Sequence, residues 1–362
     1  MKHDAPNSLQ ARDVKFHLHP STNLDQHEVN GPHVFNRGEG IYVYDDDGKQ
    51  YIEGLAGLWC ASLGFSEKRL VKAATRQLET LPFYHNFAHK AVEPSIELAE
   101  YLVEHAPVPM SKVFFTNSGS EANDTVVKLV WYYNNIVGRP QKKKIISRRG
   151  AYHGITVAAA SLTGLQYAHT AFDLPIANII HTDCPHHYHF AQEGESEADF
   201  AKRLAANLEQ LIETEGPDTI AAFIAEPLQG AGGVIVPPKG YFAAIRPILD
   251  RHDILFIADE VITGFFRTGD RFATETYGLK PDMISMAKAM SAAYQPIGGV
   301  MVSEKIYQAL VEGSRKYGMF GHGFTYSGHP VPTAVALETQ RIYDDMKIGD
   351  HVKAVSKRFQ RR

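Results

Sequence analysis

Residues 254–260 read ILFIADE and residues 283–288 read MISMAK, and these two segments decide the fold. The first begins with a continuous apolar run that is too short for a helix and is typical of a central strand in a parallel sheet covered on both faces, and the second begins with another apolar strand. The first run ends at Asp259 and the second at Lys288. Open α/β sheets bind ligands at the carboxyl ends of their strands, so Asp259 is either a site residue or the cap of the following turn.

An acid and an amine at the ends of neighbouring strands indicate a particular chemistry. Catalysis by pyridoxal phosphate (PLP) requires both, because a lysine forms a Schiff base with the cofactor and an aspartate pairs with the protonated ring nitrogen. The pair alone is also compatible with a solvated lysine and a turn aspartate. The two interpretations can be separated only by the other motifs of the chain.

The composition is that of a protein with a large core. The 362 residues are 44% hydrophobic, which is enough for more than one layer or lobe. A net charge of −4 gives no electrostatic footprint for nucleic acid or an anionic membrane. Only two cysteines occur, Cys60 and Cys184, and the first residues lack an apolar leader segment. We therefore expect a cytoplasmic protein with no nucleic-acid or membrane partner.

The first sixty residues carry few periodic signals. Residues 1–40 are polar and are predicted to form an irregular arm. Alternating residues at 41–44 and 50–53, on either side of a short polar turn, predict a β-hairpin. Trp59 follows in a glycine-rich loop, where it either packs against the core or forms the wall of a pocket.

From about residue 110 the chain alternates between strand and helix patterns, which is typical of a doubly wound sheet. We therefore expect an α/β fold with a mostly parallel central sheet flanked by helices. The predicted strands are 113–116, 144–147, 176–181, 220–225, 254–258, 283–287 and 297–302, and the predicted helices are 67–81, 95–105, 117–137, 199–215, 240–252 and 331–345.

The segment after the 113–116 strand has the features of an anion site. Ser118 and Glu121 form a capping box for the helix that follows. The Ser118-Gly119-Ser120 turn presents backbone N–H groups and two hydroxyls at the helix N-terminus, where proteins commonly hold a cofactor phosphate. Neither Gly-x-x-x-x-Gly-Lys nor Gly-x-Gly-x-x-Gly follows a first strand, which argues against nucleotides and dinucleotides.

Two other strands are followed by candidate site residues. Tyr152 and His153 lie between glycines, where they either stack on a planar ligand or pack a turn. Glu226 places a second carboxylate at the end of a buried strand. The histidines at 186–189 follow Cys184 but match no usual zinc spacing, so we expect no metal site.

Six short motifs occur in order along the chain: SGSEAN at 118–123, AYHG at 151–154, EP at 226–227, ADEV at 258–261, AK at 287–288 and GFTYSGHP at 323–330. With these motifs the chain resembles class III (ω-) aminotransferases of PLP fold type I, from about His17 to its end. It is most similar to the amine–pyruvate and putrescine or β-alanine types. The resemblance implies a homodimer with shared active sites.

The resemblance also implies a role for each matching residue. Lys288 holds PLP covalently, Asp259 keeps the ring nitrogen protonated, and Tyr152 and Val261 pack on the two ring faces. Further cofactor contacts are implied for Ser118, Gly119, Ser120, His153, Glu226 and, across the dimer interface, Thr325. The substrate pocket is implied to include Trp59, Phe87, Tyr152 and Ala231.

The same resemblance implies a domain organisation. Residues 1–57 are expected to form an N-terminal arm and hairpin, 58–328 the PLP-binding large domain, and 329–362 the start of a C-terminal small α+β domain that is incomplete here. In the family, the missing part carries an arginine that recognises the keto acid. Ala289 and Phe266 stand where the family usually has glycine.

The expected function is a ping-pong transamination through Lys288. An amino group moves from a primary amine or ω-amino acid to PLP and then to a keto acid such as pyruvate. Two alternatives remain open: other PLP chemistry on the same fold, such as an aminomutase or decarboxylase, or a truncated PLP-binding homologue without activity. The missing glycine fingerprint disfavours a dinucleotide-dependent oxidoreductase.

Overall fold

The structure is a computed structural model that describes residues 5–361. The chain forms two compact units, Met1–Lys68 and Arg69–Arg362. The domain boundaries expected at 57/58 and 328/329 remain predictions. Among residues 5–361, no helix combines the length and apolarity that a membrane crossing needs.

The Met1–Lys68 unit contains the predicted hairpin, which is confirmed: Tyr42 pairs with Ile52 and Tyr44 with Gln50. The prediction of an irregular arm is wrong for residues 5–40, which form two short helices and a third antiparallel strand. Side chains of Ser8 and Asn23 cap the N-termini of the two helices. Capping therefore marks where these helices begin, although their sequences have no apolar periodicity that would predict them. The elements are α1 (Leu9–Phe16), α2 (Leu24–Asn30), β1 (Phe35–Glu39), β2 (Tyr42–Asp45), β3 (Gln50–Ile52) and α3 (Ala56–Trp59).

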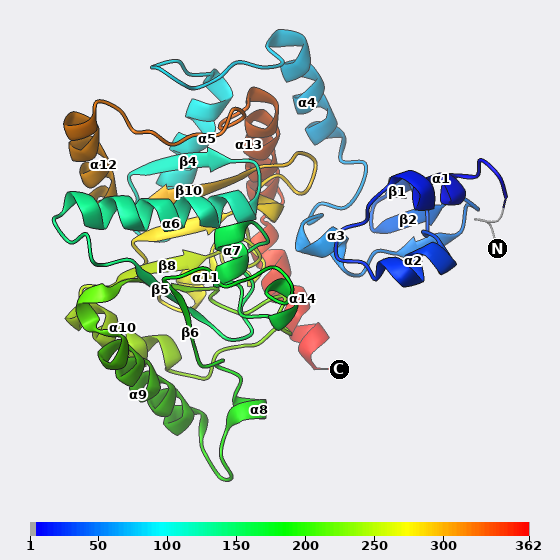
Figure 1. Ribbon diagram of the computed structural model, residues 1–362. Helices are drawn as coiled ribbons and strands as arrows, with labels where there is room; N and C mark the ends of the chain where they lie inside the picture. The colour runs from blue at the N-terminus through cyan, green and yellow to red at the C-terminus, as the bar shows by residue number, and fades with distance from the viewer. Residues whose placement is uncertain (1–4, 362) are drawn as a thin grey trace. The chain divides into compact units, whose positions relative to one another are not determined.

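The Arg69–Arg362 unit is built around a seven-stranded sheet (Figure 1). Its strand order is β4-β10-β9-β8-β7-β5-β6. All neighbours are parallel except β10, which is antiparallel to both β4 and β9. This confirms the expected mostly parallel sheet. The strands are β4 (Lys112–Thr116), β5 (Lys144–Arg148), β6 (Ile179–Thr182), β7 (Ile220–Ala225), β8 (Leu255–Asp259), β9 (Met283–Met286) and β10 (Gly298–Val302).

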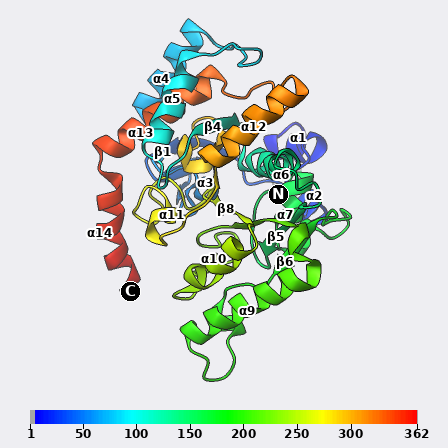
Figure 2. The same cartoon turned by 90° about the vertical axis from the view of Figure 1, so that its left-hand side faces the viewer.

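Helices cover both faces of this sheet, which explains why its central strands are apolar throughout (Figures 1 and 2). Successive residues of β8 alternate between two cores: Ile257 packs in the cluster that includes α6 and α12, and Phe256 packs in the cluster that includes α9 and α10. Helices α5 and α13 lie side by side. The helices are α4 (Lys68–Thr80), α5 (Glu93–Glu104), α6 (Gly119–Ile136), α7 (Val157–Leu162), α8 (His187–Phe190), α9 (Glu197–Glu215), α10 (Tyr241–Arg251), α11 (Ala273–Thr276), α12 (Glu304–Tyr317), α13 (Pro330–Asp345) and α14 (Ile348–Gln360).

Candidate active site

Strands β8 and β9 bring Asp259 and Lys288 to the same edge of the sheet. The parallel ladder sets Asp259 opposite Ser285, and Lys288 follows three residues later. The prediction that the two lie at neighbouring strand ends is confirmed, while their catalytic roles remain predictions. Lys288 opens a short 3-10 turn with a left-handed φ of 50°. This conformation costs a non-glycine residue roughly 1–2 kcal/mol, and such strain clusters at functional sites.

The Asp259 carboxylate is buried and firmly held. Its Oδ2 accepts hydrogen bonds from Asn123 Nδ2 at 2.8 Å and His153 Nδ1 at 2.7 Å, and its Oδ1 accepts one from Val261 N at 3.0 Å. The Asn123 amide also donates to the His153 carbonyl at 2.7 Å. Donors of this kind stabilise an ionised carboxylate and fix its orientation. The Asp259 side chain therefore has a fixed orientation at the strand edge.

The N-terminus of α6 lies against the residues that follow β8. Ser118 caps the helix, with its hydroxyl accepting from Glu121 N at 3.1 Å. Gly119 lies so close to Val261 that an added Cβ would be 2.9 Å from a Val261 methyl carbon, so a larger residue would have to displace the Val261 side chain. The first N–H groups of a helix have no carbonyl within the helix to bond to, and together with its dipole they attract anions.

The 152–156 loop closes over this helix start. Ser120 Oγ accepts from Ile155 N at 3.1 Å, and an added Cβ at Gly154 would be 2.6 Å from the same oxygen. The predicted phosphate turn and the predicted aromatic pair, Tyr152 and His153, therefore belong to one local structure.

Glu226 ties two loops together at the end of β7. Its Oε1 accepts from Tyr152 N at 3.0 Å and its Oε2 from Gly230 N at 2.8 Å. Burial raises the pKa of Glu226. Burial also raises the pKa of the half-buried Tyr152, with smaller contributions from Tyr167 and Asp259. The Glu226 carboxylate thus holds the loop of Tyr152 and the turn that contains Ala231.

These residues fit PLP. A buried carboxylate suits the protonated ring nitrogen, a helix N-terminus with two serine hydroxyls suits the phosphate, and Lys288 supplies the amine. Two buried polar atoms next to Asp259, Asn123 Oδ1 and His153 Nε2, have no hydrogen-bond partner among the described residues. Unpaired buried atoms of this kind occur where a ligand or water completes the network.

The family model described as "Aminotransferase class-III" matches residues 24–362. The chain belongs to the class-III aminotransferases. Members of this family are PLP enzymes that transfer amino groups, so PLP is the cofactor of this aminotransferase and the expected fold type, cofactor and reaction class are confirmed.

Several named proteins are similar to this aminotransferase over most of its length. "Gamma-aminobutyrate transaminase 1, mitochondrial" of Oryza sativa subsp. japonica is 57% identical over 357 residues, covering 98% of this chain and 69% of the relative. "Gamma aminobutyrate transaminase 3, chloroplastic" of Solanum lycopersicum is 57% identical over 330 residues, covering 91% of this chain and 64% of the relative. A solved ω-transaminase from Pseudomonas jessenii, in complex with PMP, is 58% identical with a TM-score of 0.95, covering 95% of this chain and 76% of that one.

Three further predicted site residues belong to other segments of the chain. Thr325 is exposed in the loop before α13. Phe87 is 43% exposed and packs against Gly323 of the same loop. Trp59 lies in α3, in the Met1–Lys68 unit, and has a left-handed φ of 61°. Their roles in the shared site and in the substrate pocket remain predictions.

The contact of Asn123 with Asp259 in this aminotransferase was not predicted from the sequence. Its side chain contacts Asp259 across 136 positions of sequence. A local signal existed, because Asn123 follows Gly119 by four residues and so lies on the same helix face. The motif SGSEAN contained the residue, but only the fold shows that its amide points at the carboxylate.

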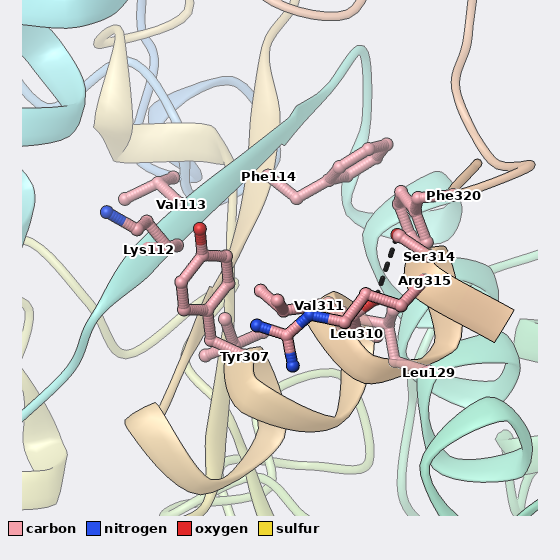
Figure 3. Close-up of a pocket in the computed structure, with 11 residues that line it drawn as sticks. Lys112, Val113, Phe114, Leu129, Tyr307, Leu310, Val311, Ser314, Arg315 and Phe320 are labelled. Carbon is pink, nitrogen blue, oxygen red and sulfur yellow. Dashed lines mark hydrogen bonds between the residues drawn. The ribbon is translucent and has the colours of Figure 1, made fainter. Parts of the chain in front are cut away.

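A cleft of about 560 Å³ lies elsewhere, between β4 and α12 (Figure 3). Apolar side chains, among them Phe114, Leu310 and Phe320, form most of its lining. None of the predicted site residues lines it. The cleft therefore gives no evidence about where the amino-group transfer takes place.

Proposed function

We propose that this class-III aminotransferase takes the amino group of an ω-amino acid such as γ-aminobutyrate, or of a simple primary amine, and passes it to pyruvate. The observation that carries the proposal is the site in which Asp259 is held by Asn123 and His153 beside the Lys288 strand end. The names of the relatives, γ-aminobutyrate transaminases and ω-transaminases, support this donor class.

Each side chain of the site contributes a separate step. Bound PLP supplies an electron-withdrawing ring that makes the substrate carbon next to the amino group acidic. Lys288 takes the proton from that carbon, a type of general-base catalysis typically worth about 10²–10⁴-fold. Asp259 holds a proton on the ring nitrogen. The Ser118-Gly119-Ser120 turn binds the phosphate, and Tyr152 packs against the ring and excludes water.

The test is alanine formation from pyruvate with γ-aminobutyrate, β-alanine, putrescine or 1-phenylethylamine as donor. Lys288→Ala should lose at least about 100-fold in rate. Lys280→Ala, which removes an exposed lysine shortly before β9, should retain full activity. Wild-type alanine formation by Lys288→Ala would refute the assignment. Release of carbon dioxide without alanine would favour a decarboxylase instead, and PLP binding without any turnover would favour a non-catalytic homologue.

We further propose that the active enzyme is a homodimer in which Thr325 reaches the phosphate of the other subunit. Its support is the motif resemblance together with the exposure of Thr325. Sedimentation should give twice the chain mass of 40.2 kDa, and Thr325→Glu should weaken PLP retention through charge repulsion, whereas Thr170→Glu at another exposed loop should not. A monomer that retains PLP would contradict this arrangement.

We propose a cytoplasmic location, in line with the low cysteine content, because only Cys60 and Cys184 occur among 362 residues. The plant relatives carry mitochondrial or chloroplastic names. Fluorescence of a tagged full-length protein in the source cells tests the location, and an organellar signal would contradict it.

A further inference from the structure

Three histidines converge on one aspartate in the Met1–Lys68 unit. Asp13 lies on α1, and its Oδ1 is 3.1 Å from His17 Nδ1. Its Oδ2 is 2.8 Å from His19 Nε2 and 3.0 Å from His27 Nε2. The imidazole rings lie close together and are tilted relative to one another, with centroid separations of 4.3 Å between His17 and His19 and 4.2 Å between His19 and His27. The cluster joins the end of α1 to α2.

The separations are close to those between ligands of one metal ion. Ligand atoms of Asp13, His17 and His19 all lie within 4.8 Å of one another. Two ligands at 2.0–2.2 Å from a tetrahedral zinc ion stand roughly 3.3 Å apart. The nitrogen–oxygen distances of 2.8 Å, from His19 to Oδ2, and 3.1 Å, from His17 to Oδ1, are a few tenths of an ångström shorter than this. Because they involve different oxygens, the carboxylate would have to rotate or bind the ion through both oxygens. His17 is the C-cap of α1 and follows Asp13 by four residues.

The chemistry of the donors favours a transition metal. An aspartate carboxylate is a ready anionic ligand at neutral pH. Imidazole nitrogens with one carboxylate suit Zn²⁺, Ni²⁺ or Cu²⁺ better than Mg²⁺ or Ca²⁺.

The cluster is open on one side. The His17 side chain is 62% exposed, whereas His27 is only 10% exposed. An ion can therefore enter past His17, and the more buried His27 is already in place on the inner side of the cluster. No apolar side chain among residues 5–68 is buried, and small units without a buried core commonly gain stability from a metal.

We propose that Asp13, His17 and His19 bind one divalent transition-metal ion, with water in the remaining position. His27 bonds to the Asp13 carboxylate and orients it, as outer partners of metal ligands commonly do. The ion ties α1 to the segment that leads into α2. This site is separate from the PLP chemistry and does not rest on the proposed function.

The experiment is calorimetric titration of Zn²⁺ into the untagged, PLP-loaded chain after dialysis against a chelator. One ion per chain should bind. His19→Gln should weaken binding by at least about 100-fold, and His27→Gln by about 10–100-fold, the range typical of an outer partner. His189→Gln, at an exposed histidine outside the Asp13 cluster, is the matched control and should bind as the wild type does.

Two further measurements keep the result unambiguous. Circular dichroism and PLP content check that His19→Gln is folded, and Asp13→Asn serves as a second variant that removes a ligand with almost no change in size. Co²⁺ titration should give the visible absorption of a low-coordinate site in the wild type and lose it in both variants. Absence of a one-to-one site, equal Zn²⁺ affinity in His19→Gln, or a loss confined to His189→Gln would each overturn the proposal.

Discussion

Replacement of Asn123 by leucine tests how far the Asp259 anion depends on its donors. The change keeps the side-chain size and removes the amide that donates to Asp259 at 2.8 Å and to the His153 carbonyl at 2.7 Å. A hydrogen bond to a charged group contributes about 1.5–3 kcal/mol, which corresponds to about 10–150-fold. If Asp259 acts on the ring nitrogen, most of this loss should fall on the chemical step.

The assay is the stopped-flow rate of the half-reaction with an ω-amino acid, together with the PLP dissociation constant. We expect kcat/KM of the half-reaction to fall about 10–100-fold. Asn134→Leu is the matched control, because Asn134 is also a buried asparagine of α6 but bonds only to the Val130 carbonyl. A rate within threefold of wild type in Asn123→Leu, or an equal loss in Asn134→Leu, would show that the amide does not act through Asp259.

Two other substitutions address the cofactor cradle and the buried acid. Gly119→Ala should raise the PLP dissociation constant about tenfold or more, because the new methyl displaces Val261 at a cost of about 1–3 kcal/mol. Gly54→Ala, where a Cβ meets nothing within 4 Å, should not, and equal constants in the two variants would contradict this. Burial raises the pKa of Glu226 in the folded state, so its contribution to stability is present at low pH and is lost as the pH rises through that raised value. As the pH rises from about 5 to about 8, the thermal midpoint of unfolding should therefore fall less in Glu226→Gln than in the wild type. An equal fall in the two proteins would contradict this expectation.

The sequence predicted the sheet because its central strands are apolar on both faces. Every residue of β7 is buried, as the run at 220–225 indicated. The orientation of β10 could not be read in the same way, because an apolar strand has the same pattern whether it runs parallel or antiparallel to its neighbours. Strand β6 begins at Ile179 rather than at the predicted 176, since apolar residues outside a strand resemble those within it.

The only part of the candidate site whose arrangement could be predicted from the sequence is the pair of residues at the ends of neighbouring strands. Asp259 and Lys288 each follow an apolar run, and their positions could be predicted from local patterns. The contacts of Asp259 with Asn123 and His153 join segments more than a hundred residues apart. They depend on helix position and loop conformation, which no short motif encodes. The Asp13 cluster lies within residues 13–27 and was missed for another reason: this polar stretch was predicted to be irregular, so the two helices that bring its histidines together were not expected.

The neighbouring acids Asp259 and Glu260 serve opposite sides of the strand end. Asp259 faces Asn123 and His153, whereas Glu260 accepts from Thr263 Oγ1 and from the backbone N–H groups of Ala273 and Thr274. Side chains alternate along a strand, so deleting one residue within β8 would move Glu260 into the position of Asp259 and Val261 into that of Glu260. The acid facing Asn123 and His153 would then be a glutamate one methylene longer, and the 263–274 turn would lose its anchor. This strand should therefore tolerate changes of residue far better than changes of length.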